Sequence, residues 1–327
     1  MTTDAPLLSV RDLTVSIRQP DGTRLPILID MAFDLQAGET LGIVGESGSG
    51  KSLLALSIIG LLPGVAQASG TIAFLGENLL ETPEDQLCAI RGDRVGMIFQ
   101  EPMTALNPAM TVGDQIAEGL VWHRGLSWRA ARAEAVDLLD RVRMPDARRR
   151  AKTYPHEMSG GQRQRVGIAI ALALKPALLI ADEPTTALDV TVQAEVLDIL
   201  DEFTREYGMA LMLVSHDLGV IARMCRETIV LYAGRRMEAG ETRAVFTQPK
   251  HPYTRGLIAA VPKRIADGGR LPTIRGRVPA FDRLPKGCVF SDRCPDVIAA
   301  CHEGEPRWTT FADSRGVRCI RAEGELE

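Results

Sequence analysis

The part of the sequence best equipped for chemistry is a glycine-rich segment that ends in a lysine and a serine. Gly45 and Gly50 enclose four residues, and Lys51 and Ser52 follow directly. This spacing is typical of a loop whose backbone N–H groups surround phosphates, whose lysine binds the terminal phosphates and whose hydroxyl binds Mg²⁺. An apolar run precedes the loop and a helical pattern follows it, which places the phosphates at a helix N-terminus. The expected ligands are Gly45, Glu46, Ser47, Gly48, Ser49, Gly50, Lys51 and Ser52.

Three other apolar runs end in polar side chains, as buried parallel strands that lead to a ligand site do. These side chains are Gln100, the pair Asp182 and Glu183, and His216. We expect Asp182 to hold Mg²⁺ and Glu183 to accept a proton from the attacking water, as acids at this place do in P-loop NTPases. Judged by its own strand alone, Gln100 could equally be a surface loop residue, and a lone histidine such as His216 is more often structural than catalytic.

A second anion site is indicated where another apolar helical pattern begins. Ser159, Gly160 and Gly161 precede this pattern. Exposed amides and a hydroxyl at a helix N-terminus can bind an anion, although a simple glycine-containing cap is the alternative. A single chain that binds one nucleotide has no evident need for two such anion sites.

The rest of the pattern predicts an α/β protein. Alternating apolar residues from 7 to 17 predict a half-buried strand, and strands near 27–35 and 71–75 would complete a small antiparallel sheet. From residue 111 to about residue 152 the period changes to that of helices, with Ser127 as a possible cap. We therefore expect a helical insertion between strands of the main sheet.

Size and composition limit the classes of protein to which the chain can belong. It has 327 residues, of which 45% are hydrophobic, and a net charge of −4. This length suits about two domains, and the charge does not favour nucleic-acid binding. The sequence shows no secretory signal and no apolar stretch of the roughly 20 residues needed to span a bilayer. These features predict a cytosolic protein. In that reducing compartment, six cysteines favour metal binding over disulfides.

Taken together, these segments resemble the ATP-binding subunit of an ABC transporter over almost the whole chain. The resemblance rests on GESGSGKS, the Gln100 loop in FQEPMTALNP, MSGGQRQRV, LLIADEP, TTALD and the His216 switch, in the family order. It implies a P-loop NTPase (RecA-like) core with an antiparallel β subdomain and a helical subdomain at about residues 101–158. Residues 1–248 would form this cassette.

The resemblance also assigns roles to single residues. Those roles are phosphate binding for Lys51, Mg²⁺ binding for Ser52, Gln100 and Asp182, general base for Glu183 and γ-phosphate contact for His216. In this family two cassettes pair head to tail, so the signature of one, here Ser159 to Gln162, completes the ATP site of the other, with Asp189 at the seam. Residues 101–108 correspond to the segment that meets the coupling helix of a membrane subunit.

The partners implied by the resemblance are a second ABC ATPase subunit, expected to be a paralogue, two transmembrane permease subunits and an extracytoplasmic solute-binding protein. The chain would lie peripherally on the cytoplasmic face of the inner membrane and hydrolyse ATP to energise import of peptides or a similar small solute. A nickel importer subunit is one alternative, and a soluble ABC ATPase acting on nucleic acid or ribosomes is another.

One position departs from the family pattern. Relatives place an aromatic ring near the end of the first strand to stack on adenine, whereas this sequence has Ile17 there and no aromatic residue before Phe33. Stacking contributes about 0.5–1.5 kcal/mol beyond the burial of area. We therefore expect weaker base discrimination, with Ile17 or the stem of Arg18 covering the ring.

Residues 249–327 form a C-terminal extension. Its stretches HPYTRGLIAAVP and KGCVFSDRCP resemble the extension of ATPases from the oligopeptide, dipeptide and nickel importer group. It contains Cys288, Cys294, Cys301 and Cys319. Four thiols suit a zinc site or a [4Fe–4S] cluster, with unligated thiols as the third alternative, and the resemblance favours a structural cluster. Cys88 and Cys225 lie apart and are expected to act as small hydrophobic residues.

Overall fold

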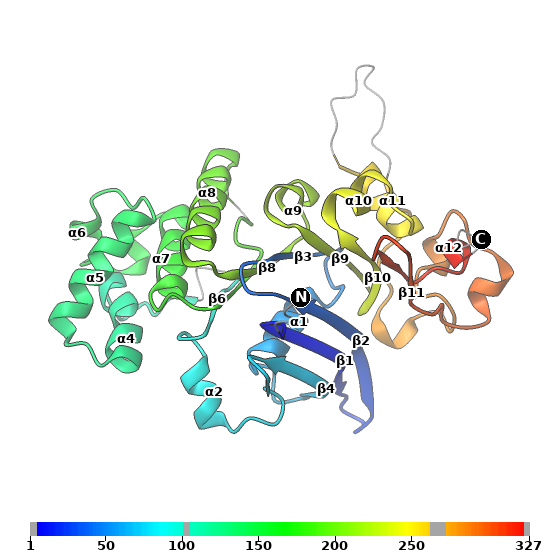
Figure 1. The fold of residues 1–327 in the computed structure, drawn as a ribbon, viewed down its shortest axis with the longest axis horizontal. Helices are drawn as coiled ribbons and strands as arrows, with labels where there is room; N and C mark the ends of the chain where they lie inside the picture. The colour runs from blue at the N-terminus through cyan, green and yellow to red at the C-terminus, as the bar shows by residue number, and fades with distance from the viewer. Residues whose placement is uncertain (1–4, 101–104, 187, 262–272, 324–327) are drawn as a thin grey trace, which may run out of the picture. The chain divides into compact units, whose positions relative to one another are not determined.

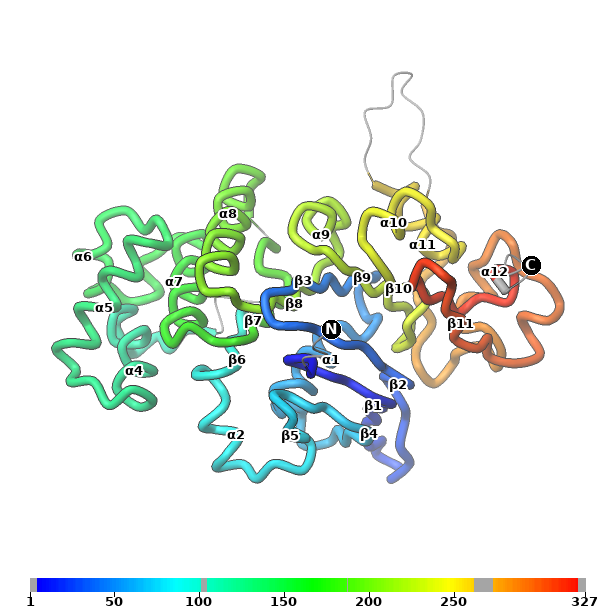
Figure 2. The backbone as a smooth tube through the Cα atoms, viewed as in Figure 1, coloured from blue at the N-terminus to red at the C-terminus, as the bar shows by residue number. Residues whose placement is uncertain are grey.

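The computed structural model describes residues 5–100, 105–186, 188–261 and 273–323. The chain, whose course is drawn in Figures 1 and 2, divides into two compact units. The first unit comprises residues 1–35, 40–80 and 214–327, and the second comprises residues 36–39 and 81–213. In the part of the chain that the structure describes, no helix is both long enough and apolar enough to cross a membrane.

The first unit contains an antiparallel sheet built from the N-terminal segment. Its strands lie in the order β2-β1-β4-β5 and are β1 (Leu8–Arg18), β2 (Arg24–Leu35), β4 (Ala66–Phe74) and β5 (Glu77–Asn78). The predicted alternation buries Leu13 and Val15 on one face of β1, and the register against β4 shifts between Arg11 and Thr14. Asp12, with a φ of 50°, lies in this bulge. The three predicted strands are confirmed, and β5 is an addition.

A second group of strands in the first unit lies in the order β11-β12-β10-β9-β3. These strands are β3 (Thr40–Val44), β9 (Glu227–Tyr232), β10 (Arg235–Glu241), β11 (Thr309–Thr310) and β12 (Gly316–Val317). Strands β3 and β9 are parallel, whereas β12 pairs with β10 in antiparallel fashion, Glu238 opposite Val317. Two strands of the C-terminal extension therefore continue the sheet that carries the phosphate loop.

The helices of the first unit are short. They are α1 (Lys51–Ile58), α9 (Leu218–Met224), α10 (Thr242–Thr247), α11 (Pro252–Ala259) and α12 (Ile320–Glu323), with 3₁₀ turns η2 (Phe281–Arg283), η3 (Ser291–Arg293) and η4 (Ala299–His302). The described part of the extension has few regular elements. Side-chain contacts with strands of the first unit therefore help to hold it in place. Arg318 donates to Asp30 Oδ2 at 2.7 Å in this way.

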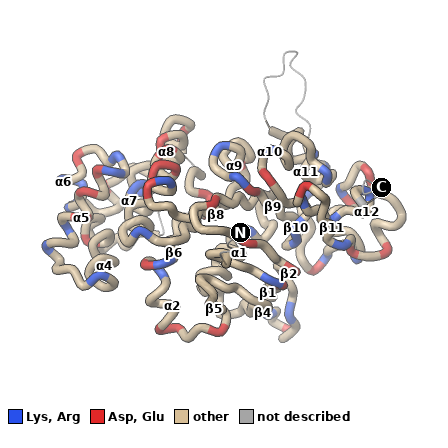
Figure 3. Tube along the Cα trace, viewed as in Figure 1, with Lys and Arg blue, Asp and Glu red and all other residues tan. Residues whose placement is uncertain are grey.

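The second unit combines three strands with a group of helices. The strands follow the order β8-β7-β6 and are β6 (Val95–Ile98), β7 (Leu178–Asp182) and β8 (Ala210–Ser215), whose last two residues belong to the first unit. The helices are α2 (Glu84–Ile90), α4 (Val112–Arg124), α5 (Trp128–Arg141), α6 (Ala147–Arg150), α7 (Gly160–Leu172) and α8 (Val190–Tyr207), with the 3₁₀ turn η1 (Pro155–Glu157). Basic and acidic residues are interspersed along α4 to α8 (Figure 3).

Local sequence signals explain where the helices of the second unit begin. Thr111 accepts a hydrogen bond from Asp114 N at the start of α4, and Ser127 accepts one from Ala130 N at the start of α5. Such caps satisfy backbone donors that have no partner within the helix. The predicted helical insertion and its serine cap are therefore confirmed. The basic residues 148–150 form the last turn of the short helix α6.

Candidate nucleotide-binding site

The predicted site residues are distributed over both units. The first unit carries Gly45 to Ser52, Ile17, Arg18, His216 and the four cysteines of the extension, and the second carries Gln100, Asp182, Glu183, Ser159 to Gln162 and Asp189. Residues 101–104 of the expected coupling segment lie outside the described residues.

The glycine-rich loop connects β3 to α1 and needs its glycines for two different reasons. A Cβ on Gly45 would lie 2.2 Å from Leu231 O, and a Cβ on Gly50 would lie 2.6 Å from Leu28 Cδ2, so close packing excludes side chains there. Gly48 has a φ of 78° and nothing within 4 Å of its Cβ position. The loop is therefore packed against β9 and β2 but open at Gly48, where backbone N–H groups can receive an anion.

Lys51 is 5% exposed and lies at the first position of α1. Its Nζ donates to Gly45 O at 2.9 Å and to Glu46 O at 3.1 Å. The ammonium is thus held inside the curve of the loop, where its charge adds to that of the helix N-terminus. Gly234 N, from the turn between β9 and β10, donates to Ser49 O at 2.9 Å and fixes the other side of the loop.

Glu46 connects the loop to two residues that the sequence analysis missed. Its backbone N–H donates to the Tyr253 hydroxyl at 2.9 Å. Its carboxylate accepts from Arg293 Nη1 at 2.6 Å and from Arg293 Nη2 at 3.0 Å. Both partners belong to the C-terminal extension, and nothing in the spacing of the sequence indicates that they reach a loop more than 200 positions away.

In the second unit, Gln100 and Glu183 lie at the ends of neighbouring parallel strands β6 and β7. Gln100 Nε2 donates to Glu183 Oε2 at 3.2 Å, and Thr186 Oγ1 donates to the same oxygen at 2.8 Å. Glu183 has a φ of 49°, a conformation that costs free energy and is concentrated at functional sites. Asp182, the preceding residue, is 4% exposed. The amide of Gln100 is therefore placed against the Glu183 carboxylate.

The signature residues begin α7 through a reciprocal cap. Ser159 Oγ accepts from Gln162 N at 3.3 Å, and Gln162 Oε1 accepts from Ser159 N at 3.2 Å. Ser159 and Gly160 are exposed, and nothing lies within 4 Å of the Cβ position of Gly160. The start of this helix therefore presents backbone amides on an open surface.

The start of α8 packs beside the start of α7. A Cβ on Gly161 would lie 3.0 Å from Val192 Cγ1. Asp189 caps α8, since its Oδ1 accepts from Thr191 N at 3.1 Å and from Val192 N at 3.0 Å. The residues expected in the signature and at the dimer seam are thus neighbours within the second unit.

His216 and the end of the first strand lie in the first unit. His216 is exposed and follows β8 directly, and Asp217 caps the next helix by accepting from Gly219 N at 2.8 Å. Ile17 is half-buried and Arg18 is exposed at the end of β1. Ile17 and Arg18 are both accessible to a ligand, as the expected contact with adenine requires.

The four cysteines of the extension line one small cavity with His251 and Phe290. Burial raises the pKa of Cys288 to about 11 and also raises the pKa of Cys294 and of Cys319. Among the described residues, no three His, Cys, Asp or Glu side chains are grouped closely enough to hold a metal ion. The structure thus shows convergence of the four thiols without the tight grouping of a single-ion site.

The two other cysteines differ from each other. Cys225 is buried, which raises its pKa to about 12 and fits the expectation of a small hydrophobic residue. Cys88 is exposed, with its sulfur 3.7 Å from Glu84 Oε1 and 3.9 Å from Arg91 Nη1. The expectation was wrong for Cys88, because this residue lies on the solvent side of α2.

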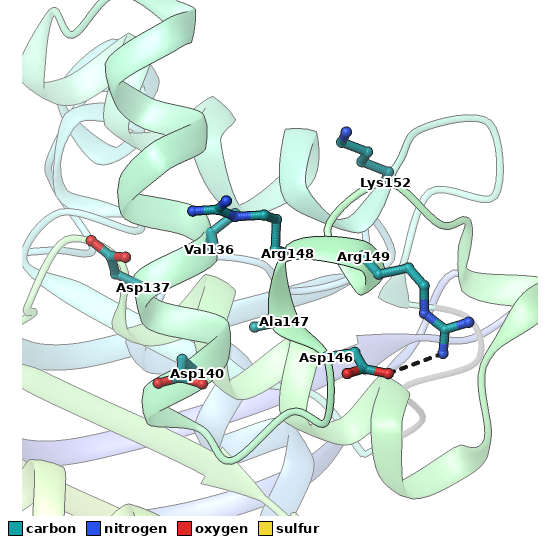
Figure 4. A pocket seen from close by; sticks show the side chains of 8 residues that line it. All are labelled: Val136, Asp137, Asp140, Asp146, Ala147, Arg148, Arg149 and Lys152. Atoms are coloured by element: carbon teal, nitrogen blue, oxygen red, sulfur yellow. Dashed lines mark hydrogen bonds and ion pairs between the residues drawn. The ribbon is translucent and has the colours of Figure 1, made fainter.

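A separate surface hollow lies between α5 and α6 (Figure 4). Its lining has both signs of charge, and Arg149 Nη2 forms an ion pair with Asp146 Oδ2 at 3.3 Å. The lining residues are Val136, Asp137, Asp140, Asp146, Ala147, Arg148, Arg149 and Lys152. This hollow contains none of the predicted site residues.

Comparison with protein-family models gives two matches. The model described as ABC transporter matches residues 28–186. The model described as oligopeptide/dipeptide transporter, C-terminal region, matches residues 237–301. Together they include the phosphate loop, the signature, the acidic pair and three of the four cysteines of the extension.

Comparison with curated proteins gives relatives of nearly equal length. The chain is similar to the oligopeptide transport ATP-binding protein OppD of Salmonella typhimurium, with 50% identity over 320 residues, 98% of this chain and 95% of the relative. It is also similar to OppD of Escherichia coli, with 49% identity over 320 residues, 98% of this chain and 94% of the relative.

Solved structures similar to this chain include the ATP-binding cassette MJ0796, as a dimer in a post-hydrolysis state bound to ADP and Pi. The identity is 29% and the TM-score 0.65, with 72% of this chain and 99% of that chain covered. Another is cbiO1 of Clostridium perfringens, part of the ABC transporter complex cbiONQ, at 27% identity and a TM-score of 0.63, with 75% of this chain and 92% of that chain covered. The predicted fold class is confirmed.

Proposed function

We propose a function on the premise that this chain belongs to the ATP-binding proteins of the ABC transporters, in the oligopeptide and dipeptide group. The chain binds and hydrolyses ATP to energise the import of peptides. The observation that carries this proposal is near-full-length similarity to two proteins named for oligopeptide transport. No finding favours nickel as the cargo, or nucleic acid or ribosomes as the partner.

The roles proposed for single residues follow the chemistry of each group. The backbone of residues 45–50 and the ammonium of Lys51 bind the phosphates of ATP. Mg²⁺ prefers oxygen ligands, and the proposed ones are the Ser52 hydroxyl, the Gln100 amide oxygen and the Asp182 carboxylate. An ion held by these residues would neutralise charge on the phosphates during transfer of the γ-phosphoryl group to water.

Glu183 is the proposed general base and His216 the proposed γ-phosphate contact. The hydrogen bonds from Gln100 and Thr186 to Glu183 Oε2 orient the carboxylate, which would accept a proton from the attacking water. His216 can donate from its imidazole to an oxygen of the γ-phosphate. The two side chains therefore have different tasks, proton acceptance and charge stabilisation.

The second anion-binding helix N-terminus is proposed to act on the ATP of a second cassette. Exposed amides at Gly160 and Gly161, with the Ser159 hydroxyl and Gln162, suit a γ-phosphate that arrives from another chain. Asp189, beside them, would lie at the seam. That the similar cassette MJ0796 is a dimer supports this proposal. The partner cassette is proposed to be a paralogue, as in the importer group.

The remaining partners are proposed from the family. They are two transmembrane permease subunits, which would contact residues 101–108, and an extracytoplasmic solute-binding protein. The chain would lie peripherally on the cytoplasmic face of the inner membrane. The boundaries of the cassette at residues 1–248, of its helical subdomain at about 101–158 and of the extension at 249–327 are also proposals.

We further propose that Cys288, Cys294, Cys301 and Cys319 hold a [4Fe–4S] cluster. The four thiols line one cavity, and the resemblance of the extension to that of the importer group favours an iron–sulfur cluster over zinc. Burial disfavours thiolates unless a positive group compensates them, and a bound cluster supplies that compensation. Its proposed task is to staple a segment with little regular structure.

The cluster proposal is tested on protein purified without air. We expect iron and acid-labile sulfide in equal amounts, a brown colour, and loss of both from Cys294→Ser. Cys88→Ser, which changes an exposed thiol outside the cavity, serves as the control and keeps the iron. A colourless wild-type protein that contains zinc or no metal would refute the cluster.

The transport proposal is tested in liposomes that contain the chain with its membrane subunits and binding protein. A mixture of short peptides from digested casein should stimulate ATP hydrolysis and accumulate inside in an ATP-dependent way. Lys51→Ala should abolish both signals. Stimulation by Ni²⁺ without stimulation by the peptide mixture would assign the chain to the nickel alternative.

A further inference from the structure

Arg293 of the extension forms an ion pair with Glu46 of the phosphate loop. Its side chain is 4% exposed, whereas that of its partner Glu46 is 29% exposed. Two parallel hydrogen bonds, of 2.6 Å and 3.0 Å, join the guanidinium to the two carboxylate oxygens of Glu46. A bidentate, largely buried pair of this kind fixes direction as well as distance.

Every donor of the Arg293 guanidinium has a partner. Besides Glu46, its Nε donates to Arg275 O at 2.8 Å, its Nη2 to Gly276 O at 3.4 Å and its Nη1 to the Tyr232 hydroxyl at 3.4 Å. These five contacts use all five N–H groups of an arginine. Burial alone lowers the pKa of Arg293, but the Glu46 carboxylate and the Tyr232 hydroxyl outweigh it and raise the pKa. The Arg293 side chain is therefore charged and held in a single orientation.

Tyr253 holds the same loop residue from a second direction. Its hydroxyl accepts the backbone N–H of Glu46, and its ring is completely buried. The ring packs against Tyr232 with centroids 4.7 Å apart and against Phe290 with centroids 5.2 Å apart. Because Phe290 lies three positions before Arg293, one aromatic cluster supports both contacts to the loop.

The charge of Glu46 gives these contacts a consequence for the ligand. A carboxylate inside a loop that binds phosphates repels them unless a cation neutralises it. Arg293 supplies that cation, and its bidentate geometry fixes the direction of the carboxylate. Without Arg293, Glu46 would keep its negative charge and gain freedom to approach the phosphates.

We propose that Arg293 and Tyr253 of the C-terminal extension are positioning residues of the ATP site, which act through Glu46 on the charge and shape of the phosphate loop. This proposal rests on the proposed ATP-binding function. The extension then contributes directly to nucleotide affinity, in addition to any role as a structural staple.

The test is calorimetric titration of the full-length chain with MgADP, which needs the phosphate loop but no hydrolysis. Arg293→Ala should raise the dissociation constant about tenfold, within the usual range of coupling between sites. Tyr253→Phe keeps the ring and loses only the hydroxyl, so it should give a smaller rise. Arg255→Ala removes an exposed ion pair with Asp296 in the same extension and should bind as the wild type does.

A charge-removing second substitution separates positioning from mere structural support. Adding Glu46→Gln to Arg293→Ala removes the unpaired carboxylate and should restore most of the affinity, and the Glu46→Gln single variant completes the cycle. In the assembled complex, Arg293→Ala should raise KM for ATP more than it lowers kcat. A structural role alone predicts a lower melting temperature and no rescue.

The outcomes distinguish this inference from the function on which it rests. Wild-type binding of MgADP with equal binding by Arg293→Ala, or a failure of Glu46→Gln to restore affinity, overturns only the positioning role. A wild-type chain that binds neither MgADP nor MgATP overturns the proposed function itself. If Arg293→Ala does not fold, Tyr253→Phe decides the question, since an unchanged dissociation constant there also contradicts the inference.

Discussion

Gln100 and Glu183, 83 positions apart in the sequence, are joined by a hydrogen bond of 3.2 Å between Nε2 and Oε2. The bond is possible because β6 and β7 are adjacent and parallel, so both strands end at the same edge. The carboxylate that we propose as the base is thereby oriented by an amide that we propose as a Mg²⁺ ligand. Changes in the Mg²⁺ site and in the base should consequently affect each other.

Glu183→Gln should abolish steady-state ATP hydrolysis while ATP binding persists. The amide cannot accept the proton of the attacking water, and the loss of a general base typically costs about 10²–10⁴-fold in rate. Phosphate release measures the rate, and size-exclusion chromatography with MgATP should show a longer-lived dimer. Glu202→Gln, which alters an exposed ion pair with Arg143, is the control. Undiminished hydrolysis by Glu183→Gln in the assembled complex would remove the assignment of the base.

The two serine caps of the second unit separate a capping role from a signature role. Ser159 and Ser127 both accept a backbone N–H at 3.3 Å at the start of a helix. Replacement of either serine by alanine should cost about 1 kcal/mol of stability, as measured by chemical unfolding. Only Ser159→Ala should also lower ATP-dependent dimerisation and hydrolysis, by about tenfold if one hydrogen bond to a charged phosphate is lost. Equal effects of both variants on hydrolysis would leave Ser159 with a capping role alone.

Ile17→Phe should increase the preference for ATP over GTP. Ile17 is half-buried at the end of β1, where a ring could stack on the base. Stacking of this kind contributes about 0.5–1.5 kcal/mol, which sets the upper limit of the expected change. The measurement is the ratio of kcat/KM for the two nucleotides in wild type and variant. Identical ratios would mean that this position does not contact the base.

Thiol labelling should distinguish the two cysteines outside the extension. Iodoacetamide reacts with thiolates, so exposed Cys88 should react in the folded protein. Buried Cys225, whose pKa is raised to about 12, should react only after denaturation. Mass spectrometry of peptides from both residues reads out the result as pH increases from 7 to 9. Labelling of Cys225 at the rate of Cys88 would show that the region around β3 and α9 opens readily.

Much of the site could be predicted because its chemistry is local in sequence. A few adjacent residues are enough to predict the role of the glycine-rich loop, of the acidic pair after β7 and of the serine before α7. The strand β1 was predictable from its alternating apolar residues, and β2 and β4 were expected as its partners in a small antiparallel sheet. Short strands such as β5 and β12 were not, since two residues carry no period and their pairing depends on the tertiary fold.

The contacts of Glu46 with the extension could not be predicted from the sequence. Arg293 and Tyr253 reach the loop only because the extension folds back onto the sheet, over a separation of more than 200 positions. Likewise, Cys88 and Cys225 look alike as isolated thiols, and only the orientation of α2 decides that one of them faces solvent. Long-range packing, which no local pattern encodes, determines these outcomes.

The antiparallel pairing of β12 with β10 bears on how this protein can be divided. A chain ending at residue 248 would leave the backbone groups of Glu238 and Ala239 without the partners they have in Val317 and Gly316. An unprotected sheet edge readily pairs with other molecules. The truncated cassette should therefore aggregate more readily than the full chain, in which β12 covers this part of the β10 edge.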